Sequence, residues 1–217
     1  MPRLEMRGRI SSAGFASGDR FVIGDWRVSP IGAFADVMWA RPDGERVLLA
    51  SSSEAAELVT TIYRFDRCQV VGMTVADEPR EVRAEAGQVA LRLVGAAGWR
   101  LPGGRRRPAA WHRLVEAPVA RLVLGVQVYG TSPAGVREWY RADEWRPVVA
   151  ASASVAGEGL GELRPLDPPC RFGFSEPPRR PSLVRVRPLL EDPSGRLGEL
   201  AARHLHRDEP LSPMHAS

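Results

Sequence analysis

The stretch from residue 137 to residue 145 contains the residue types that acid–base chemistry on a small molecule needs. Glu138 and Asp143 supply carboxyl groups, which can hold or accept a proton when a pocket shields them from water. Arg137 and Arg141 supply guanidinium groups, which bind carboxylates and phosphates. We therefore expect Glu138 or Asp143 to act as the acid–base group if this stretch is catalytic. Either arginine would then hold an anionic substrate.

Aromatic side chains accompany these charged groups. They are Trp139, Tyr140 and Trp145, with Tyr129 a few residues upstream. Aromatic walls around a few polar groups are typical of small-molecule pockets, so we expect these rings to contact a ligand. The same residues would also be explained by aromatic core packing with salt bridges around it, and the sequence leaves both interpretations open.

Two other places have groups that could do chemistry. His112 and Glu116 are four residues apart on a predicted helix, where the carboxylate would orient the imidazole as a base or form an ordinary surface pair. Asp36 interrupts the apolar segment from residue 34 to residue 39, and burial there would raise its pKa. The interpretation that we favour places Asp36 on the solvent side of a strand.

Several cofactor and metal chemistries can be set aside. All 30 basic residues are arginine, so Schiff-base catalysis, pyridoxal attachment and a Walker-type lysine are excluded. Cys68 and Cys170 are far apart and belong to no zinc-binding spacing. His204, His206, Asp208 and His215 are candidate metal ligands, but His204 and His206 diverge on a helix, and the segment leads into a loose tail. The sequence predicts neither a cofactor nor a metal.

Composition limits the class of protein. With 217 residues and 44% hydrophobic content, we expect one globular domain over residues 1–206 and a flexible tail over residues 207–217. The net charge of +4 is small for a nucleic-acid-binding protein. The chain has no apolar run long enough to span a membrane and no apolar signal segment, so we expect a cytoplasmic protein. Its oligomeric state is not predictable.

The elements that must position these residues are mostly strands. Residues 34–40 and 45–50 flank Arg41-Pro42-Asp43-Gly44, a turn sequence that predicts a hairpin. Ser51 and Glu54 have capping-box spacing and predict a helix over residues 53–63. Further strands are expected at residues 6–12, 20–28, 67–76, 80–84, 88–94 and 148–156, and further helices at residues 111–127 and after Ser194.

The Trp/Tyr stretch that begins at Gly135 fits either a helix or a strand. As a helix it places Val136, Trp139 and Tyr140 on one side. As a strand it alternates between two sides, one with Arg137, Trp139, Arg141, Asp143 and Trp145 and the other with Val136, Glu138, Tyr140 and Glu144. We favour a strand followed by a turn.

These elements predict an α+β fold that is mainly antiparallel. We expect a partly closed barrel or a strongly curved sheet, with two helices packed on it and a short C-terminal helix. The pattern is similar at the level of fold to lipocalin-like and acetoacetate-decarboxylase-like barrels. Decarboxylase chemistry of the latter kind would need a lysine, which this chain does not have.

Three phrases carry a resemblance to a family. Residues 14–22 (GFASGDRFV), 135–140 (GVREWY) and 171–178 (RFGFSEPP) resemble segments of a family of uncharacterised actinobacterial proteins of about this size. The resemblance covers most of the chain and implies a single domain, but no activity.

The leading functional hypothesis is the binding of a small, partly apolar, anionic molecule between the sheet and the aromatic stretch. An alternative is an enzyme that uses a carboxyl group in the same pocket. A third is a peripheral membrane or protein-partner module that uses Arg105 to Arg107 and the helix after them, because consecutive arginines attract anionic surfaces.

Overall fold

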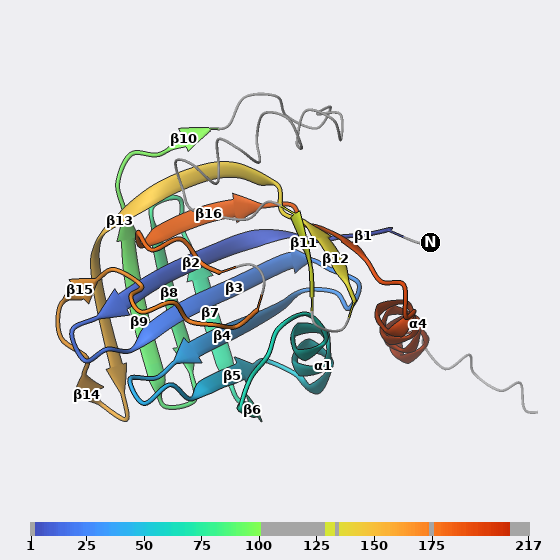
Figure 1. Ribbon diagram of the computed structural model, residues 1–217, viewed down its shortest axis with the longest axis horizontal. Helices are drawn as coiled ribbons and strands as arrows, with labels where there is room; N and C mark the ends of the chain where they lie inside the picture. Colours follow the sequence, from blue (N-terminus) through green and yellow to red (C-terminus); the bar gives the residue numbers. More distant parts are fainter. Residues whose placement is uncertain (1–2, 101–128, 133–134, 174–175, 209–217) are drawn as a thin grey trace, which may run out of the picture.

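The computed structural model describes residues 3–100, 129–132, 135–173 and 176–208 (Figure 1). Its helices are α1 (Ser53–Ile62) and α4 (Arg196–Asp208). Its strands are β1 (Arg3–Glu5), β2 (Arg7–Phe15), β3 (Arg20–Val28), β4 (Phe34–Ala40), β5 (Arg46–Ala50), β6 (Arg67–Val70), β7 (Met73–Asp77), β8 (Glu81–Ala86), β9 (Val89–Gly95), β10 (Trp99–Arg100), β11 (Tyr129–Thr131), β12 (Arg137–Trp139), β13 (Ala142–Val155), β14 (Glu158–Gly159), β15 (Leu163–Arg164), β16 (Ser182–Val186) and β17 (Leu189–Glu191).

One large sheet organises the molecule. Its strand order is β6-β5-β4-β3-β2-β16-β13-β9-β8-β7, and β10, β14 and β15 pair along its margins. All pairs are antiparallel apart from β5 with β6. The sheet curls so strongly that β7, β8 and β9 lie across β2 to β5 (Figure 1), which makes half of a barrel. A smaller sheet has the order β1-β17-β12-β11.

Local sequence signals account for the first half of the chain. Gly44 has a φ of +93° in the predicted turn between β4 and β5, a conformation that glycine adopts without strain. Helix α1 begins after Ser52, whose side chain accepts a hydrogen bond from the Ala55 amide. The cap is therefore Ser52 and not Ser51, because the Ser51 hydroxyl accepts the Ala35 amide of β4 instead.

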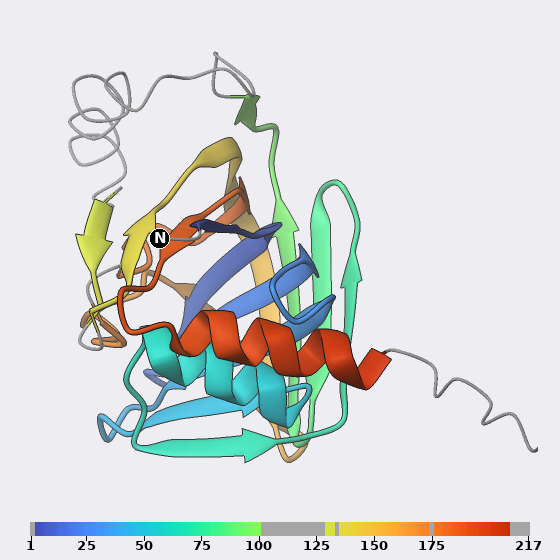
Figure 2. The same ribbon diagram turned by 90° about the vertical axis from the view of Figure 1, so that its right-hand side faces the viewer.

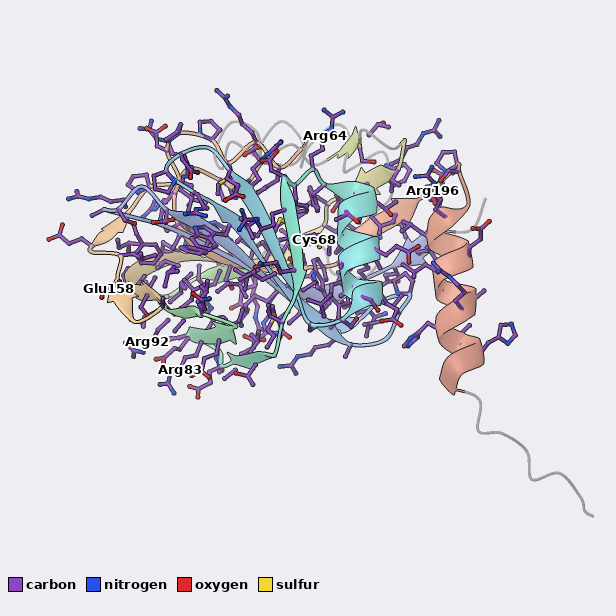
Figure 3. The ribbon with its side chains drawn as sticks, turned by 90° about the horizontal axis from the view of Figure 1, so that it is seen from below. Arg64, Cys68, Arg83, Arg92, Glu158 and Arg196 are labelled. Atoms are coloured by element: carbon purple, nitrogen blue, oxygen red, sulfur yellow. The ribbon has the colours of Figure 1, made fainter. Side chains whose placement is uncertain are left out.

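The expected single strand over residues 67–76 is two strands. β6 pairs in parallel with β5, and the chain then turns at Val71 and Gly72 into β7, which lies at the opposite end of the sheet order. The crossover through α1 makes the parallel pairing possible, since parallel neighbours cannot be joined by a tight turn. Figure 3 shows Cys68 on β6 beside α1, and Arg83 and Arg92 projecting from the β8–β9 hairpin.

The two faces of the sheet bury separate apolar clusters. Residues of one parity, such as Phe21 and Val37, point into the curl, where they meet β8 and β9. Residues of the other parity, such as Met38 and Leu48, point toward α1, α4 and Phe172. Strands β2, β3 and β4 are consequently covered on both faces, as continuous apolar strands require.

The two described helices lie side by side on the second face (Figure 2). α1 buries Ala55, Leu58, Val59 and Ile62 against the sheet, and α4 buries Leu197 and Leu200. The α+β class, the antiparallel strands and the strongly curved sheet are thus confirmed. The helix expected over residues 111–127 lies outside the described residues, and α4 extends to Asp208.

Candidate functional site

A cavity of about 50 Å³ lies between the sheet and the segments that cover its α1-facing side. The sheet supplies lining residues from β2, β3, β4 and β16. The cover supplies the residue that ends α1, the residue that follows β12, and part of the proline-rich segment. The lining residues are Ile10, Ser12, Val22, Gly24, Trp26, Asp36, Met38, Tyr63, Tyr140, Phe172, Glu176, Pro177, Pro178, Ser182 and Val184.

Asp36 is the central polar group of this cavity. Only 1% of the residue is exposed, and the indole Nε1 of Trp26 donates a 3.0 Å hydrogen bond to its Oδ1. Gly24 makes this arrangement possible, because a Cβ at that position would lie 2.3 Å from Asp36 Oδ1 and 2.6 Å from Trp26 Nε1. The absence of a side chain at Gly24 therefore leaves room for the Asp36 carboxyl group above β3.

Burial raises the pKa of Asp36 to about 7, although the hydrogen bond from Trp26 acts in the opposite direction. The other carboxyl oxygen, Oδ2, is buried without a hydrogen-bond partner among the described residues. Asp36 thus corrects our expectation. It does not face solvent, because helix α1 and the proline-rich segment cover the face of β4 on which it lies.

A second buried carboxyl group lies behind the cavity wall. Glu138, on β12, is 3% exposed, and the hydroxyl of Tyr63 donates a 3.4 Å hydrogen bond to its Oε2. Burial raises the pKa of Glu138 to about 7. Burial and the neighbouring Glu138 carboxyl raise the pKa values of Tyr63 and Tyr140, so both phenols stay protonated.

Two more oxygens of the lining have no partner in the described structure. Ser182, at the start of β16, is 1% exposed, and its Oγ is buried without a hydrogen bond. Oε2 of Glu176 is also buried without a hydrogen bond from the described residues, although the residue as a whole is partly exposed. With Oδ2 of Asp36, the lining thus contains three oxygens that no donor among the described residues satisfies.

The residues predicted from the sequence divide between this cavity and other places. Alternation along β12 puts Glu138 and Val136 on the buried side and Arg137 on the exposed side. Tyr140 lines the cavity, and Glu138 lies behind Tyr63. Arg137 lies 4.0 Å from Glu191 of the neighbouring strand, outside the cavity.

Asp143 is held elsewhere. Both of its oxygens accept hydrogen bonds from Arg187, at 2.6 and 2.7 Å. Arg141 is half-buried and does not line the cavity, and its carbonyl oxygen accepts the amide of Arg187 at 2.7 Å. A register shift between Ala142 and Glu144 follows, so the simple alternation expected for this stretch ends there.

Two of the remaining predicted aromatics, Trp139 and Trp145, pack beside the site rather than in it. Trp139 has the guanidinium of Arg3 5.7 Å from its ring centre. Trp145 is buried on β13, where its ring lies 5.5 Å from that of Trp99. Tyr129 lies on β11, opposite Trp139 in the strand register. The Arg105–Arg107 run, His112 and Glu116 lie outside the described residues.

Sequence reasoning missed several contributors to the site, and Phe172 and Glu176 were noted only within the segment that carries the family resemblance. Trp26 and Ser182 are ordinary strand residues, and Tyr63 was assigned only to the end of a helix. In the β3–β4 hairpin, Asp36 lies opposite Gly24, and Trp26 is two residues further along the same face; this diagonal arrangement was the available signal for the Trp26–Asp36 pair. Nothing local indicates that Ser182 comes near it.

A contrasting charged group, here called the seam cluster, lies on the opposite face of the sheet. Asp77 of β7 forms an ion pair with Arg9 of β2, and both side chains are almost fully buried. Arg9 also donates a 2.6 Å hydrogen bond to the carbonyl of Glu78. Burial lowers the pKa of Arg9, and Asp77 opposes this change. The cluster consists of Arg9, Arg27, Asp77, Glu144, Arg146 and Arg185.

In the part of the chain that the structure describes, no three histidine, cysteine, aspartate or glutamate side chains come together as metal ligands would. None of the described helices combines the length and the apolar character that crossing a bilayer requires. Comparisons of the chain with protein-family models, with curated proteins and with solved structures gave no match. The function is therefore argued from the site itself.

Proposed function

We propose that this protein binds a small molecule in the cavity above Asp36, with a polar head group at the carboxyl and an apolar part against the walls. The observation that supports the proposal most strongly is a pair of oxygens, Asp36 Oδ2 and Ser182 Oγ, that lack a partner among the described residues and belong to residues that are 1% exposed. A buried polar atom without a hydrogen bond costs about 1–3 kcal/mol. A ligand that supplies the hydrogen bonds would recover this free energy.

The size of the cavity limits the ligand. About 50 Å³ of free volume would hold roughly three or four water molecules, so only the head group of a ligand or a very small molecule fits inside. Five of the six partly exposed lining residues belong to the cover and one, Ile10, to the sheet; the five are Tyr63, Tyr140, Glu176, Pro177 and Pro178. The rest of a longer ligand would therefore leave the cavity on that side.

The polar groups of the site do not favour the anionic ligand expected from the sequence. No arginine lines the cavity within the described ranges, and Arg137 and Arg141 lie outside it. Binding in an aromatic-walled pocket remains the proposal. The carboxyl groups near the cavity, and not an arginine, therefore determine which ligand charge the site favours.

Binding is tested by native mass spectrometry of the purified protein and by thermal-shift assays against small acids, alcohols, amines and amides. The matched variants are Ser182→Val, which removes the unpartnered hydroxyl and fills space, and Ser152→Val, on an exposed position of β13. We expect a stabilising compound whose effect disappears in Ser182→Val and persists in Ser152→Val. The proposal is contradicted if no compound raises the melting temperature of the wild type or of Ser152→Val and native mass spectrometry shows no bound molecule.

Acid–base catalysis in the same site is a second candidate. The observation in its favour is that the pKa values of both Asp36 and Glu138 are about 7, so each carboxyl group can gain or lose a proton near neutrality. Mass spectrometry of the bound molecule over time would show a change in mass or structure. That change should stop in Asp36→Asn.

We also propose a cytoplasmic location. Cys68 and Cys170 are free thiols, as is usual in a reducing compartment, and burial raises the pKa of the Cys170 thiol to about 12. Separation of cell fractions followed by detection of the native protein would test this proposal. Recovery in a secreted or membrane fraction would contradict it.

A further inference from the structure

We infer that the ligand is a small organic cation, an alkylammonium whose charged head lies between Asp36, Glu176 and the aromatic rings of the cavity. This inference rests on the proposed binding function and specifies its ligand class.

The charge of the lining supports a cation. Its ionisable side chains besides the two tyrosines are Asp36 and Glu176, and Glu138 lies directly behind Tyr63. Within the described structure, no guanidinium lies close enough to Asp36 or Glu138 to lower its pKa. The chain has 30 arginines, so a lack of counterions around two buried carboxyl groups is a specific feature of this place. A bound cation would supply the missing positive charge.

The hydrogen-bonding capacity of the lining points the same way. Its three unpartnered oxygens, on Asp36, Glu176 and Ser182, are all able to accept. A primary ammonium group has three N–H donors and no acceptor. A carboxylate ligand would bring acceptors only, so it could pair with the Ser182 hydroxyl but not with ionised Asp36 and Glu176, and an alcohol would bring a single donor.

The walls suit a cation as well. Trp26, Tyr63, Tyr140 and Phe172 contribute aromatic rings to a cavity whose other walls are mainly aliphatic. Cations are attracted to the faces of aromatic rings, and to tryptophan and tyrosine in particular. The attraction is stronger where water is excluded, as it is beside Asp36. The rings and the carboxyl groups therefore favour the same head group.

The affinity for an ammonium ligand should depend on pH, because the ligand and a proton compete for the Asp36 carboxyl group. The groups near Asp36 are Trp26, Tyr63 and, through Tyr63, Glu138 and Tyr140. Arg46 and Cys170 lie near Glu176. None of these neighbours places a positive charge on Asp36, so the free carboxyl group is half protonated near pH 7. An ammonium binds to the ionised form, so its affinity rises with pH through this range as the proton leaves.

The experiment compares three probes of similar size and different charge on the full chain. They are butylammonium, butan-1-ol and propionate, each at up to about 10 mM, since ligands with so few atoms bind weakly. Thermal unfolding is followed at pH 6 and pH 8 at constant ionic strength. The proteins are the wild type, Asp36→Asn, and Asp43→Asn as an exposed control in the β4–β5 turn. Asp36→Asn keeps the acceptor oxygen for Trp26, so this variant should fold.

We expect butylammonium to raise the melting temperature of the wild type and of Asp43→Asn, more at pH 8 than at pH 6, and to lose its effect in Asp36→Asn. Butan-1-ol and propionate should have smaller effects. Equal or greater stabilisation by butan-1-ol or propionate overturns the cation assignment and retains the binding site. No stabilisation by any of the three probes overturns the cation assignment, and a bare mass with no response to the wider panel overturns the binding site too.

Discussion

The two faces of strands β2 and β3 bury charge in opposite ways. In the seam cluster, four arginines surround Asp77 and Glu144, and ion pairs connect β7 to the middle of the sheet. On the other face, the hydrogen bonds that the described residues give to the buried carboxyl groups of Asp36 and Glu138 come only from Trp26 and Tyr63. A compensated cluster serves the fold by holding the curl closed. Uncompensated carboxyl groups beside a cavity have a cost that a ligand would offset.

The largest effect should come from breaking the seam cluster. Arg9→Leu leaves Asp77 buried without its closest counterion, and removing one partner of a buried ion pair typically costs about 3–5 kcal/mol. Urea denaturation would measure the loss in free energy of unfolding. The double variant Arg9→Leu/Asp77→Leu should recover much of this loss. A loss in Arg9→Leu of well under about 1 kcal/mol would show that the seam cluster does not hold the sheet closed.

The stability of the protein should depend on pH, because the Asp36 carboxyl group is buried without a counterion in the described structure. The folded protein holds a proton on Asp36 up to a pKa of about 7, whereas the usual value is 3.8. This contribution to stability is complete below about pH 4 and is lost as pH rises to 7, by up to about 4 kcal/mol. Asp36→Asn should therefore gain stability relative to the wild type between pH 5 and pH 8 in urea titrations. A difference that stays constant over this range would contradict the raised pKa.

Gly24→Ala should have the next largest effect. The new methyl group would overlap Asp36 Oδ1 and Trp26 Nε1, so the two side chains have to separate. Overpacking of this kind costs about 1–3 kcal/mol. Gly159→Ala is the control, because nothing lies within 4 Å of its Cβ position. Equal stability of both variants in thermal unfolding would mean that the Trp26–Asp36 contact is not tightly packed.

Ser182→Ala should have the smallest effect and the opposite sign. It removes a buried hydroxyl group that has no partner in the described structure, and should raise the free energy of unfolding of the ligand-free protein by about 1 kcal/mol. Ser152→Ala, on the exposed side of β13, should leave it unchanged. A loss of stability in Ser182→Ala would indicate that the hydroxyl has a partner, such as a bound water molecule.

Where the signal was local, the sequence predicted the fold well. The Arg41–Gly44 turn and the helix start near Ser52 depend on a few adjacent residues, and both form as expected. The split of residues 67–77 between two ends of the sheet was not predictable, because it depends on strand pairings that are distant in sequence.

The site was predicted in part. Alternation on β12 correctly grouped Glu138 with Tyr140 and separated them from Arg137 and Trp139. The partners of Glu138 and Asp36 come from segments far away in the sequence, such as Tyr63 and the start of β16. The burial of Asp36 depends on those segments, so its own strand gave no basis for choosing between a buried and an exposed carboxyl group.

The most direct test of the account is an NMR measurement of the pKa of the Asp36 carboxyl group, with Asp36→Asn to assign its signal. The account predicts a value of about 7 in the free protein, and a lower value when butylammonium is bound. A value near the ordinary 3.8 in the free protein would mean that Asp36 is already compensated. That result would contradict the difference between the two faces on which the proposed site depends.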